Sequence, residues 1–243
     1  MQKEELELQK PENRVYSYGD QSRIVNPESH SYNEPHEHVD DGYVKYNCIW
    51  TQSQPLAHEQ IEELNEWRQK LYDKHLIGAY PNKVGFGNVS VRIPGTDKFI
   101  VSGTETGNIE KLNEMHYCIV TFVDINANTL YCTGPVRASS ESMTHAAAYA
   151  ADPNISAIIH CHSPTMWSKF IKKIPTTTKS AKYGTPQIAN AIQKLVSKEK
   201  KRPLLVVMGG HETGMFCVGK DIASVGEEYL KVYKKLKLSP ART

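Results

Sequence analysis

The chain has 243 residues, and its 29 basic side chains nearly balance its 27 acidic ones, which gives a formal net charge of +2. This length suits one large domain, alone or with an appendage, and so small a charge gives no reason to expect a nucleic-acid or membrane partner. The five cysteines are odd in number and are never spaced as Cys-x-x-Cys, which argues against a disulfide framework and against a cysteine zinc knuckle.

The first 42 residues differ from the rest of the chain because they are polar and contain several prolines. We expect residues 1–42 to form an extension that is partly disordered or loosely docked, and residues 43–243 to form the folded domain. The start of the chain is too polar for a signal peptide, and no apolar run approaches the roughly 18 residues that span a membrane, so we expect a cytoplasmic protein. One cluster of potential metal ligands lies in the extension, where no scaffold fixes its geometry, and we interpret it as solvated or as binding metal only adventitiously. Its residues are His30, Glu34, His36, Glu37 and His38.

The domain is expected to open with a strand and a helix. Alternating side chains predict a strand over residues 43–50. Apolar residues at three- and four-residue spacing, from Ile61 to Leu71, predict a helix over residues 57–75. Four further strands follow, and the last two are joined by a turn at residues 126–128. These strands are expected at residues 89–93, 99–102, 116–124 and 130–133.

A second helix follows Ser139 and Ser140, either of which could cap it, and Glu141 falls in its first turn. This helix is expected to end at Asp152. The later elements are helices at residues 165–170, 185–197 and 222–236, strands at residues 204–208 and 215–218, and a glycine turn at residues 209–211. Because strands and helices interleave without a strict βαβ rhythm, we predict an α/β fold with a mixed sheet covered by helices on both faces.

The most informative motif is His160-Cys161-His162, which directly follows the apolar run of residues 155–159. This run predicts a short buried strand. Because side chains alternate along a strand, His160 and His162 point to one face while Cys161 points to the other. Two imidazoles side by side at a strand end are suited to bind zinc or a similar divalent ion. Two such histidines could equally serve as hydrogen-bonding groups in the core.

Two further residues at element ends could complete a metal site. His211 lies in the glycine turn after a strand and Glu141 starts a helix, and functional groups are often held at such ends by a rigid scaffold. Taken alone, His211 is more often a simple hydrogen-bonding group, and Glu141 could serve only to stabilise the helix N-terminus. His145 lies one helical turn after Glu141 and faces the same side, where it either supports the site or only packs.

Six motifs in the same order resemble those of the class II aldolase/adducin family, whose members include fuculose-phosphate, rhamnulose-phosphate and ribulose-phosphate enzymes. The motifs are Gly87-Asn88-Val89-Ser90, Ser102-Gly103, Ser139-Ser140-Glu141, His160-Cys161-His162-Ser163-Pro164, Gly184-Thr185-Pro186 and His211, within a resemblance that covers residues 57–236. The resemblance implies a three-layer α/β/α fold around a central mixed, mainly antiparallel sheet. It also implies a homotetramer with sites near the subunit interfaces.

In this family three histidines hold a divalent metal, usually zinc, and the glutamate acts as acid and base. The resemblance implies that His160, His162 and His211 bind Zn²⁺, or else Mn²⁺, Co²⁺ or Fe²⁺, and that Glu141 is the catalytic carboxylate. Three protein ligands leave a position open for substrate, where the metal can stabilise an enediolate and the carboxylate can move the proton. The family's phosphate pocket, whose N–H groups and hydroxyls suit a dianion, corresponds to Gly87, Asn88, Ser102, Gly103, Ser139 and Ser140.

The chain departs from the family at the tyrosine that protonates the leaving aldehyde in the aldolases. That position, shortly before Gly184, is Ser180. Tyr183 is close in sequence, but it points away from the site if residues 178–184 are extended. The late Asn-His-Gly of many members is here Gly210-His211-Glu212. These departures bear on the cleavage step and not on the metal site.

The resulting hypothesis is a divalent-metal-dependent lyase that cleaves a carbon–carbon bond in a small hydroxy-carbonyl compound, a sugar phosphate in particular. An epimerase or a dehydratase would use the same metal-bound enolate and stays open as an alternative. A different class is an adducin-like binding domain without catalysis. The presence of Glu141 together with all three histidines argues against it, because a pure interaction domain has no need of them.

Overall fold

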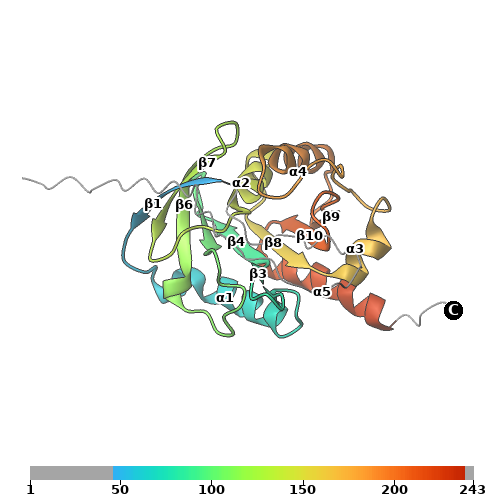
Figure 1. The fold of residues 1–243 in the computed structure, drawn as a ribbon, viewed down its shortest axis with the longest axis horizontal. Helices are drawn as coiled ribbons and strands as arrows, with labels where there is room; N and C mark the ends of the chain where they lie inside the picture. The colour runs from blue at the N-terminus through green and yellow to red at the C-terminus, as the bar shows by residue number, and fades with distance from the viewer. Residues whose placement is uncertain (1–45, 239–243) are drawn as a thin grey trace, which may run out of the picture.

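The computed structural model describes residues 46–238, so the predicted extension of residues 1–42, with its histidine cluster, lies outside the described residues. One eight-stranded sheet forms the centre of the fold. Its strands are β1 (Asn47–Gln52), β4 (Asn88–Arg92), β5 (Phe99–Ser102), β6 (Tyr117–Asp124), β7 (Thr129–Gly134), β8 (Ala157–His162), β9 (Leu204–Val207) and β10 (Gly214–Gly219). They lie in the order β1-β7-β6-β5-β4-β8-β10-β9, and all neighbours are antiparallel except β1 and β7 (Figure 1).

Helices cover both faces of this sheet. They are α1 (His58–Tyr72), α2 (Ser142–Ala151), α3 (Pro164–Phe170), α4 (Pro186–Lys198) and α5 (Ile222–Leu238). Helices α2 and α4 pack together on one face, and α1, α3 and α5 lie on the other (Figure 1). The predicted three-layer α/β/α fold with a mixed, mainly antiparallel sheet is therefore confirmed. A small hairpin of β2 (Gly78–Ala79) and β3 (Gly85–Phe86) and a 3-10 turn at Glu114–His116 are further elements, which the sequence pattern does not indicate.

Strand β8 lies between two apolar cores, and its alternation decides which side chains face the site. Ile158 packs in the core beneath α2 and α4, whereas Ile159 and Cys161 pack in the core beneath α1 and α5. His160 and His162 therefore project toward the α2 side, opposite Cys161, as the strand period predicts. Burying one isoleucine side chain contributes about 1.5–3 kcal/mol, so a shift of β8 by one residue would be strongly unfavourable.

The bounds of most elements match the sequence prediction closely, with one difference at the site. Helix α2 begins at Ser142, so Glu141 occupies the N-cap position and not the first turn, and its side chain makes no capping bond. The Ser139 hydroxyl instead accepts a hydrogen bond from the Glu141 N–H at 3.4 Å. The sequence pattern could not distinguish the two arrangements, because both place serine just before the helix.

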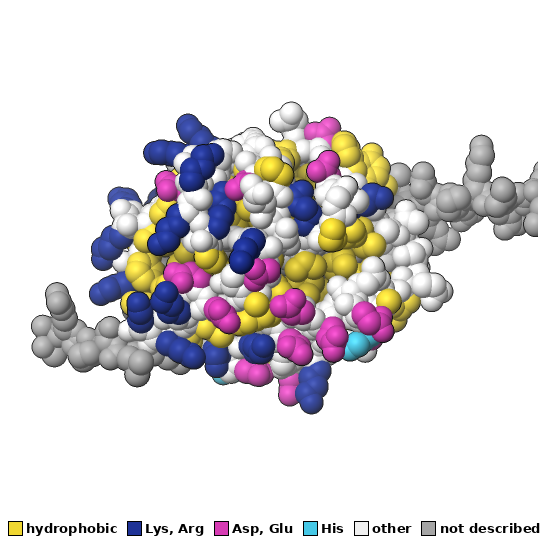
Figure 2. Space-filling model, turned by 180° about the vertical axis from the view of Figure 1, so that it is seen from behind, with side chains coloured by type: hydrophobic (Ala, Val, Ile, Leu, Met, Phe, Trp, Pro, Cys, Tyr) yellow, Lys and Arg dark blue, Asp and Glu magenta, His cyan; other side chains and the backbone are white. Residues whose placement is uncertain are grey.

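The back of the molecule carries both signs of charge. Lys231, Lys234 and Lys235 are exposed on α5. Figure 2 shows Lys and Arg side chains gathered at the left of this face, with Asp and Glu side chains nearer its centre and lower edge. We interpret both groups as solvated surfaces. Within residues 46–238, no helix combines the length and the apolar character needed to cross a membrane.

The contact between α1 and α5 predicts how one small substitution affects stability. A Cβ on Gly226 of α5 would lie 2.2 Å from Cε3 of Trp67 on α1. In an exposed helix a change from glycine to alanine stabilises by about 1 kcal/mol, but overpacking a core costs about 1–3 kcal/mol. Gly226→Ala is therefore expected to lower the free energy of unfolding, measured by urea titration beside the exposed control Glu227→Ala. A gain in stability would contradict the close helix contact.

Candidate functional site

Three buried histidines from two parts of the chain converge on one point. The Nε2 atom of His162 lies 3.2 Å from Nε2 of His160 and 3.1 Å from Nε2 of His211. The Nε2 atoms of His160 and His211 lie 3.3 Å apart, so the three nitrogens form a nearly equilateral triangle. The most exposed of the three, His162, is only 4% exposed. Among the described residues, no other group of three or more His, Cys, Asp or Glu side chains brings its ligand atoms this close.

Antiparallel pairing places His211 beside the two strand histidines. Strand β10 pairs with β8 so that Gly214 lies opposite His162, and the turn that enters β10 carries His211. A Cβ on Gly214 would lie 2.6 Å from Cδ2 of His211, so the imidazole can occupy its place only because residue 214 is a glycine. A contact between β8 and the β9–β10 turn thus assembles the site from residues that are distant in the sequence.

The outer ring nitrogens of the strand histidines are held by hydrogen bonds. Nδ1 of His160 lies 3.1 Å from the carbonyl oxygen of Met215. That oxygen can only accept, so Nδ1 donates and Nε2 of the neutral ring carries a lone pair. Nδ1 of His162 lies 2.8 Å from the hydroxyls of both Tyr80 and Thr213. Partners of this kind orient the histidines of metal sites. Sequence reasoning misses Tyr80 and Thr213, because a single hydroxyl in a loop has no spacing signal.

Burial keeps these imidazoles neutral. Burial lowers the pKa of His160 from 6.5 to about 4. Burial first, and then the neighbouring His211 and His160, lower the pKa of His162 well below its usual value. The neutral ring is the form that binds a metal ion. Tetrahedral zinc with Zn–N distances of about 2.1 Å spaces its ligand nitrogens about 3.4 Å apart, which is close to the triangle observed. The donor atoms and their spacing therefore fit a divalent ion.

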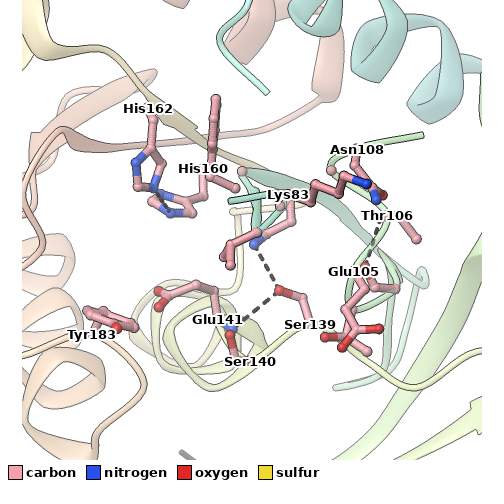
Figure 3. Close-up of a pocket in the computed structure, with 18 of the residues that line it drawn as sticks. Lys83, Glu105, Thr106, Asn108, Ser139, Ser140, Glu141, His160, His162 and Tyr183 are labelled. Atoms are coloured by element: carbon pink, nitrogen blue, oxygen red, sulfur yellow. Dashed lines mark hydrogen bonds between the residues drawn. The ribbon is translucent and has the colours of Figure 1, made fainter. Parts of the chain in front are cut away.

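Glu141 lies beside the histidines at the start of α2. Its side chain is buried, and Oε2 accepts a hydrogen bond from the Thr144 hydroxyl at 3.1 Å. In Figure 3 its carboxylate points into the cavity, on the side facing His160 and His162. A carboxylate in this position is suited to accept a proton from a bound molecule and to return it.

A pocket of about 230 Å³ connects the histidines with most of the residues predicted to bind phosphate. The members of that predicted set that line it are Gly87, Asn88, Gly103, Ser139 and Ser140. Within this wall, Nδ2 of Asn88 donates to the Ser139 hydroxyl at 2.9 Å. Ser102 lies behind the wall and does not line the pocket, because its hydroxyl accepts a hydrogen bond from the Val89 N–H at 3.2 Å. Phosphate binding by this set stays a prediction.

The far end of the pocket contains residues that the sequence analysis does not single out. Lys83 comes from the loop between β2 and β3, and residues 104–108 follow β5. Figure 3 shows Lys83, Thr106 and Asn108 on one side of the cavity and Tyr183 on the opposite side. Lys83 and Glu105 bring both signs of charge to this end. No periodic pattern marks these residues, because they lie in irregular loops.

The condition under which Tyr183 would point away from the site, an extended segment at residues 178–184, is not met. Residues 178–184 form turns and not an extended segment. The centroid of the Tyr183 ring lies 4.7 Å from that of His211, and Tyr183 lines the pocket. Ser180, at the position of the family's tyrosine, is bonded to the Thr178 hydroxyl at 3.1 Å and does not line it. The structure therefore offers a tyrosine at the site, but from a different position in the chain.

His145 packs beside the site without lining the pocket. It is fully buried, its Nδ1 lies 2.7 Å from the Ser90 hydroxyl, and its ring packs edge-on against Phe216. Burial lowers the pKa of His145 well below its usual value, and nearby His160 lowers it further. The sequence leaves two roles open for His145, support of the metal site or packing alone. These contacts are those of a residue that packs in the core.

Comparisons with known proteins give a family and a fold. The model of the class II aldolase and adducin N-terminal domain matches residues 63–225. A search of curated proteins gives no match. Among solved structures, the chain is similar to an L-fuculose 1-phosphate aldolase (18% identity, 76% of this chain and 86% of that chain covered, TM-score 0.56). It is also similar to a sugar-phosphate aldolase from Thermotoga maritima (18% identity, 74% of this chain and 93% of that chain covered, TM-score 0.56). A third similar structure is YgbL from Klebsiella pneumoniae (16% identity, 76% of this chain and 91% of that chain covered, TM-score 0.56). At such low identity these structures establish the fold alone.

The converging nitrogens predict a stoichiometric metal ion. After dialysis against dilute zinc, the protein is expected to retain about one ion per chain, and His160→Ala is expected to lose it, as measured by mass spectrometry of the metal. His58 is exposed and bonded to Glu114 at 2.6 Å, far along the chain from the site, so His58→Ala serves as the control that keeps the ion. Equal metal content in His160→Ala and the wild type would contradict the ligand set.

The lowered histidine pKa predicts that the metal-free protein loses stability in acid. Between about pH 4 and 6.5, His160 is protonated in the unfolded chain but not in the folded one. The unfolded state then binds more protons, so the free energy of unfolding falls as the pH drops through this window, by up to about 3 kcal/mol from His160 alone. Thermal melts of metal-free protein between pH 7 and 4.5 measure the loss. His160→Gln is expected to reduce the slope, and an unchanged slope would argue against this origin.

Proposed function

Because the chain belongs to the class II aldolase and adducin family, we propose that it is a metal-dependent aldehyde-lyase that acts on a small hydroxy-carbonyl compound, a sugar phosphate in particular. In this proposal His160, His162 and His211 hold a divalent ion, with zinc as the first choice and Mn²⁺, Co²⁺ or Fe²⁺ as alternatives. Glu141 is the catalytic acid and base. The observation that carries the proposal is the triangle of Nε2 atoms beside a buried carboxylate in one pocket.

The chain's own residues divide the chemical work. A divalent ion at this site would supply Lewis-acid polarisation of a carbonyl oxygen. Glu141 takes a proton from a substrate hydroxyl or carbon and returns it after the bond breaks. The hydrogen bond from the Thr144 hydroxyl holds Oε2 of Glu141 in place for this step. Such positioning by the scaffold lowers the entropy cost of reaching the transition state.

The other wall of the pocket supports a phosphorylated substrate. Ser139 and Ser140 lie just before the N-terminus of α2, where the helix dipole favours an anion. Gly87, Asn88 and Gly103 add backbone and amide groups on the same pocket. The sugar-phosphate aldolases that share the fold bear names consistent with this substrate class.

Two alternatives differ from the lyase in the step after proton removal. An epimerase or a dehydratase would use the same metal and the same carboxylate. Cleavage additionally needs a group that exchanges a proton with the substrate oxygen that becomes the aldehyde carbonyl, and the Tyr183 side chain lines the pocket and can take the place of the family's tyrosine. This observation favours the lyase. A non-catalytic, adducin-like role is disfavoured because the three histidines and Glu141 meet in one pocket. By family analogy we expect a cytoplasmic homotetramer with sites near the interfaces.

Replacing Glu141 separates catalysis from metal binding. Glu141→Gln is expected to keep the metal ion and to lower turnover by about 10²- to 10⁴-fold, because the amide cannot accept the proton. Aldehyde release from a panel of sugar phosphates measures this, and Glu59→Gln on the exposed face of α1 is the control. Full turnover by Glu141→Gln would contradict its role. Metal-loaded wild-type protein that turns over no member of the panel would favour the binding role instead.

A further inference from the structure

A groove lies on the outer surface where α1 and α5 meet, across the sheet from α2 and α4. It has a volume of about 500 Å³ and is lined by Trp67, Glu227, Leu230, Lys231, Lys234 and Lys235. The two apolar side chains among these, Trp67 and Leu230, are partly or largely buried, whereas the three lysines are exposed. Figure 2 shows hydrophobic side chains between the Lys and Arg side chains at the left of the back face. We call this surface the lysine groove.

The rim of the lysine groove is basic. Its three lysines stand against a single acidic lining residue, Glu227. The ammonium group of Lys70 adds a further positive charge, 4.4 Å from the centre of the Trp67 ring. Lys70 and Lys231 also pair with a glutamate of their own helix, at 3.7 and 3.3 Å, but pairs of this kind near the surface are weak. Exposed lysines alone would indicate a solvated surface, and the apolar hollow between them is what makes this one suited to a partner.

One short run in residues 1–45, which precede the described residues, has the complementary chemistry. It is Glu4-Glu5-Leu6-Glu7-Leu8, and it holds three carboxylates, no basic residue and the only two leucines of residues 1–45. Leucine side chains suit an apolar hollow, and carboxylates suit a rim of lysines. We call residues 4–8 the acidic segment.

The tether between the acidic segment and the domain is long enough to bring the two surfaces together. Residues 9–45 separate the segment from the described residues. A fully extended chain of this length spans up to about 120 Å, and a flexible one has an end-to-end distance of about 30–35 Å. A domain of about 190 residues is about 40 Å across. A tether of this length gives an effective concentration approaching the millimolar range, which favours the groove of the same chain over that of another copy in dilute solution.

We infer that the lysine groove is a docking site for the acidic segment of the same chain. In this arrangement Leu6 and Leu8 fill the hollow beside Trp67, and the three carboxylates lie against the lysine rim. The inference gives the predicted extension a defined place on the domain. It does not depend on the proposed function, because the groove and the histidine site lie on different faces of the sheet.

Carbodiimide cross-linking of the full chain in dilute solution tests the inference, because the reagent joins a carboxylate to an amine only where the two are in contact. Mass spectrometry of the digested protein is expected to find products that join the acidic segment to residues 231–235 within one chain. Leu6→Ser with Leu8→Ser keeps every reactive group and removes the apolar contact, so it is expected to lower the yield about 10-fold or more. Val15→Ser, in the same extension, is the matched control and keeps the wild-type yield.

A charge exchange tests the rim. Lys234→Glu with Lys235→Glu is expected to lower the yield about 10-fold, because like charges then face each other. Adding Glu4→Lys and Glu5→Lys to that variant is expected to restore cross-links between the two surfaces, with acid and amine exchanged. Lys194→Glu with Lys198→Glu, two exposed lysines of α4 on the other face of the sheet, is the control that leaves the yield unchanged. High salt is expected to lower the wild-type yield, since it screens exposed charges.

The absence of products between the acidic segment and residues 231–235 would overturn the inference. Equal yields from the wild type and the double leucine variant would overturn it too, because chance encounters of a long tether would then explain the products. Products that join two chains and increase with protein concentration would instead make the groove a contact between copies. Sedimentation of the wild type with phosphatidylserine vesicles, lost in Lys234→Glu with Lys235→Glu and without any cross-link, would reject the segment and indicate a membrane surface.

Discussion

The approach of three buried imidazoles to within 3.3 Å of one another is the constraint on which the rest of the structure depends. Nitrogen lone pairs this close repel one another unless a cation or a shared proton lies between them, so the fold must hold each ring from outside. The Met215 carbonyl holds His160, and the hydroxyls of Tyr80 and Thr213 hold His162. These partners come from β10, its preceding turn and the β2–β3 loop, which explains why such distant segments meet at this end of β8.

The part of the site that follows from local periodicity could be predicted, and the part that depends on loops could not. Side chains alternate along β8, and the apolar run before His160 marks it as a buried strand. The sequence therefore predicts that His160 and His162 lie on one face. The approach of His211 depends on the register of β10 against β8; its place in a glycine turn after a strand made it a candidate, and the family resemblance supported that interpretation. The side on which Tyr183 lies depended on whether residues 178–184 are extended, and turns in this segment place its ring beside His211.

Loop residues were the main omission at the site. Lys83, Glu105 and Thr106 line the pocket, yet nothing in their spacing distinguishes them from any polar loop. Their position comes from tertiary contacts, above all the bonds from Arg68 to the backbone of residues 106–110. Arg68 shares the buried face of α1 with Ile61 and Leu64, as its spacing indicates, but the spacing does not show what its guanidinium contacts. The fold was easier to predict than the site, because the apolar positions of many helices and strands all indicate the same three-layer arrangement.

The pocket thus has two ends with different physical origins. One is a rigid nitrogen cluster set by strand pairing, and the other is a polar loop surface held by a buried arginine. Glu141 lies between them at the start of α2, where a bound molecule can be reached from both. The two ends are supported by different contacts, strand pairing for the histidines and the hydrogen bonds of Arg68 for the loops.

X-ray absorption at the zinc edge of the zinc-loaded protein tests the three-histidine site most directly. The site predicts about three imidazole nitrogens at about 2.0–2.1 Å, with the remaining coordination from oxygen. His211→Ala is expected to remove one imidazole from that sphere. Coordination by sulfur at about 2.3 Å, or by oxygen alone, would contradict a metal site built from these three histidines.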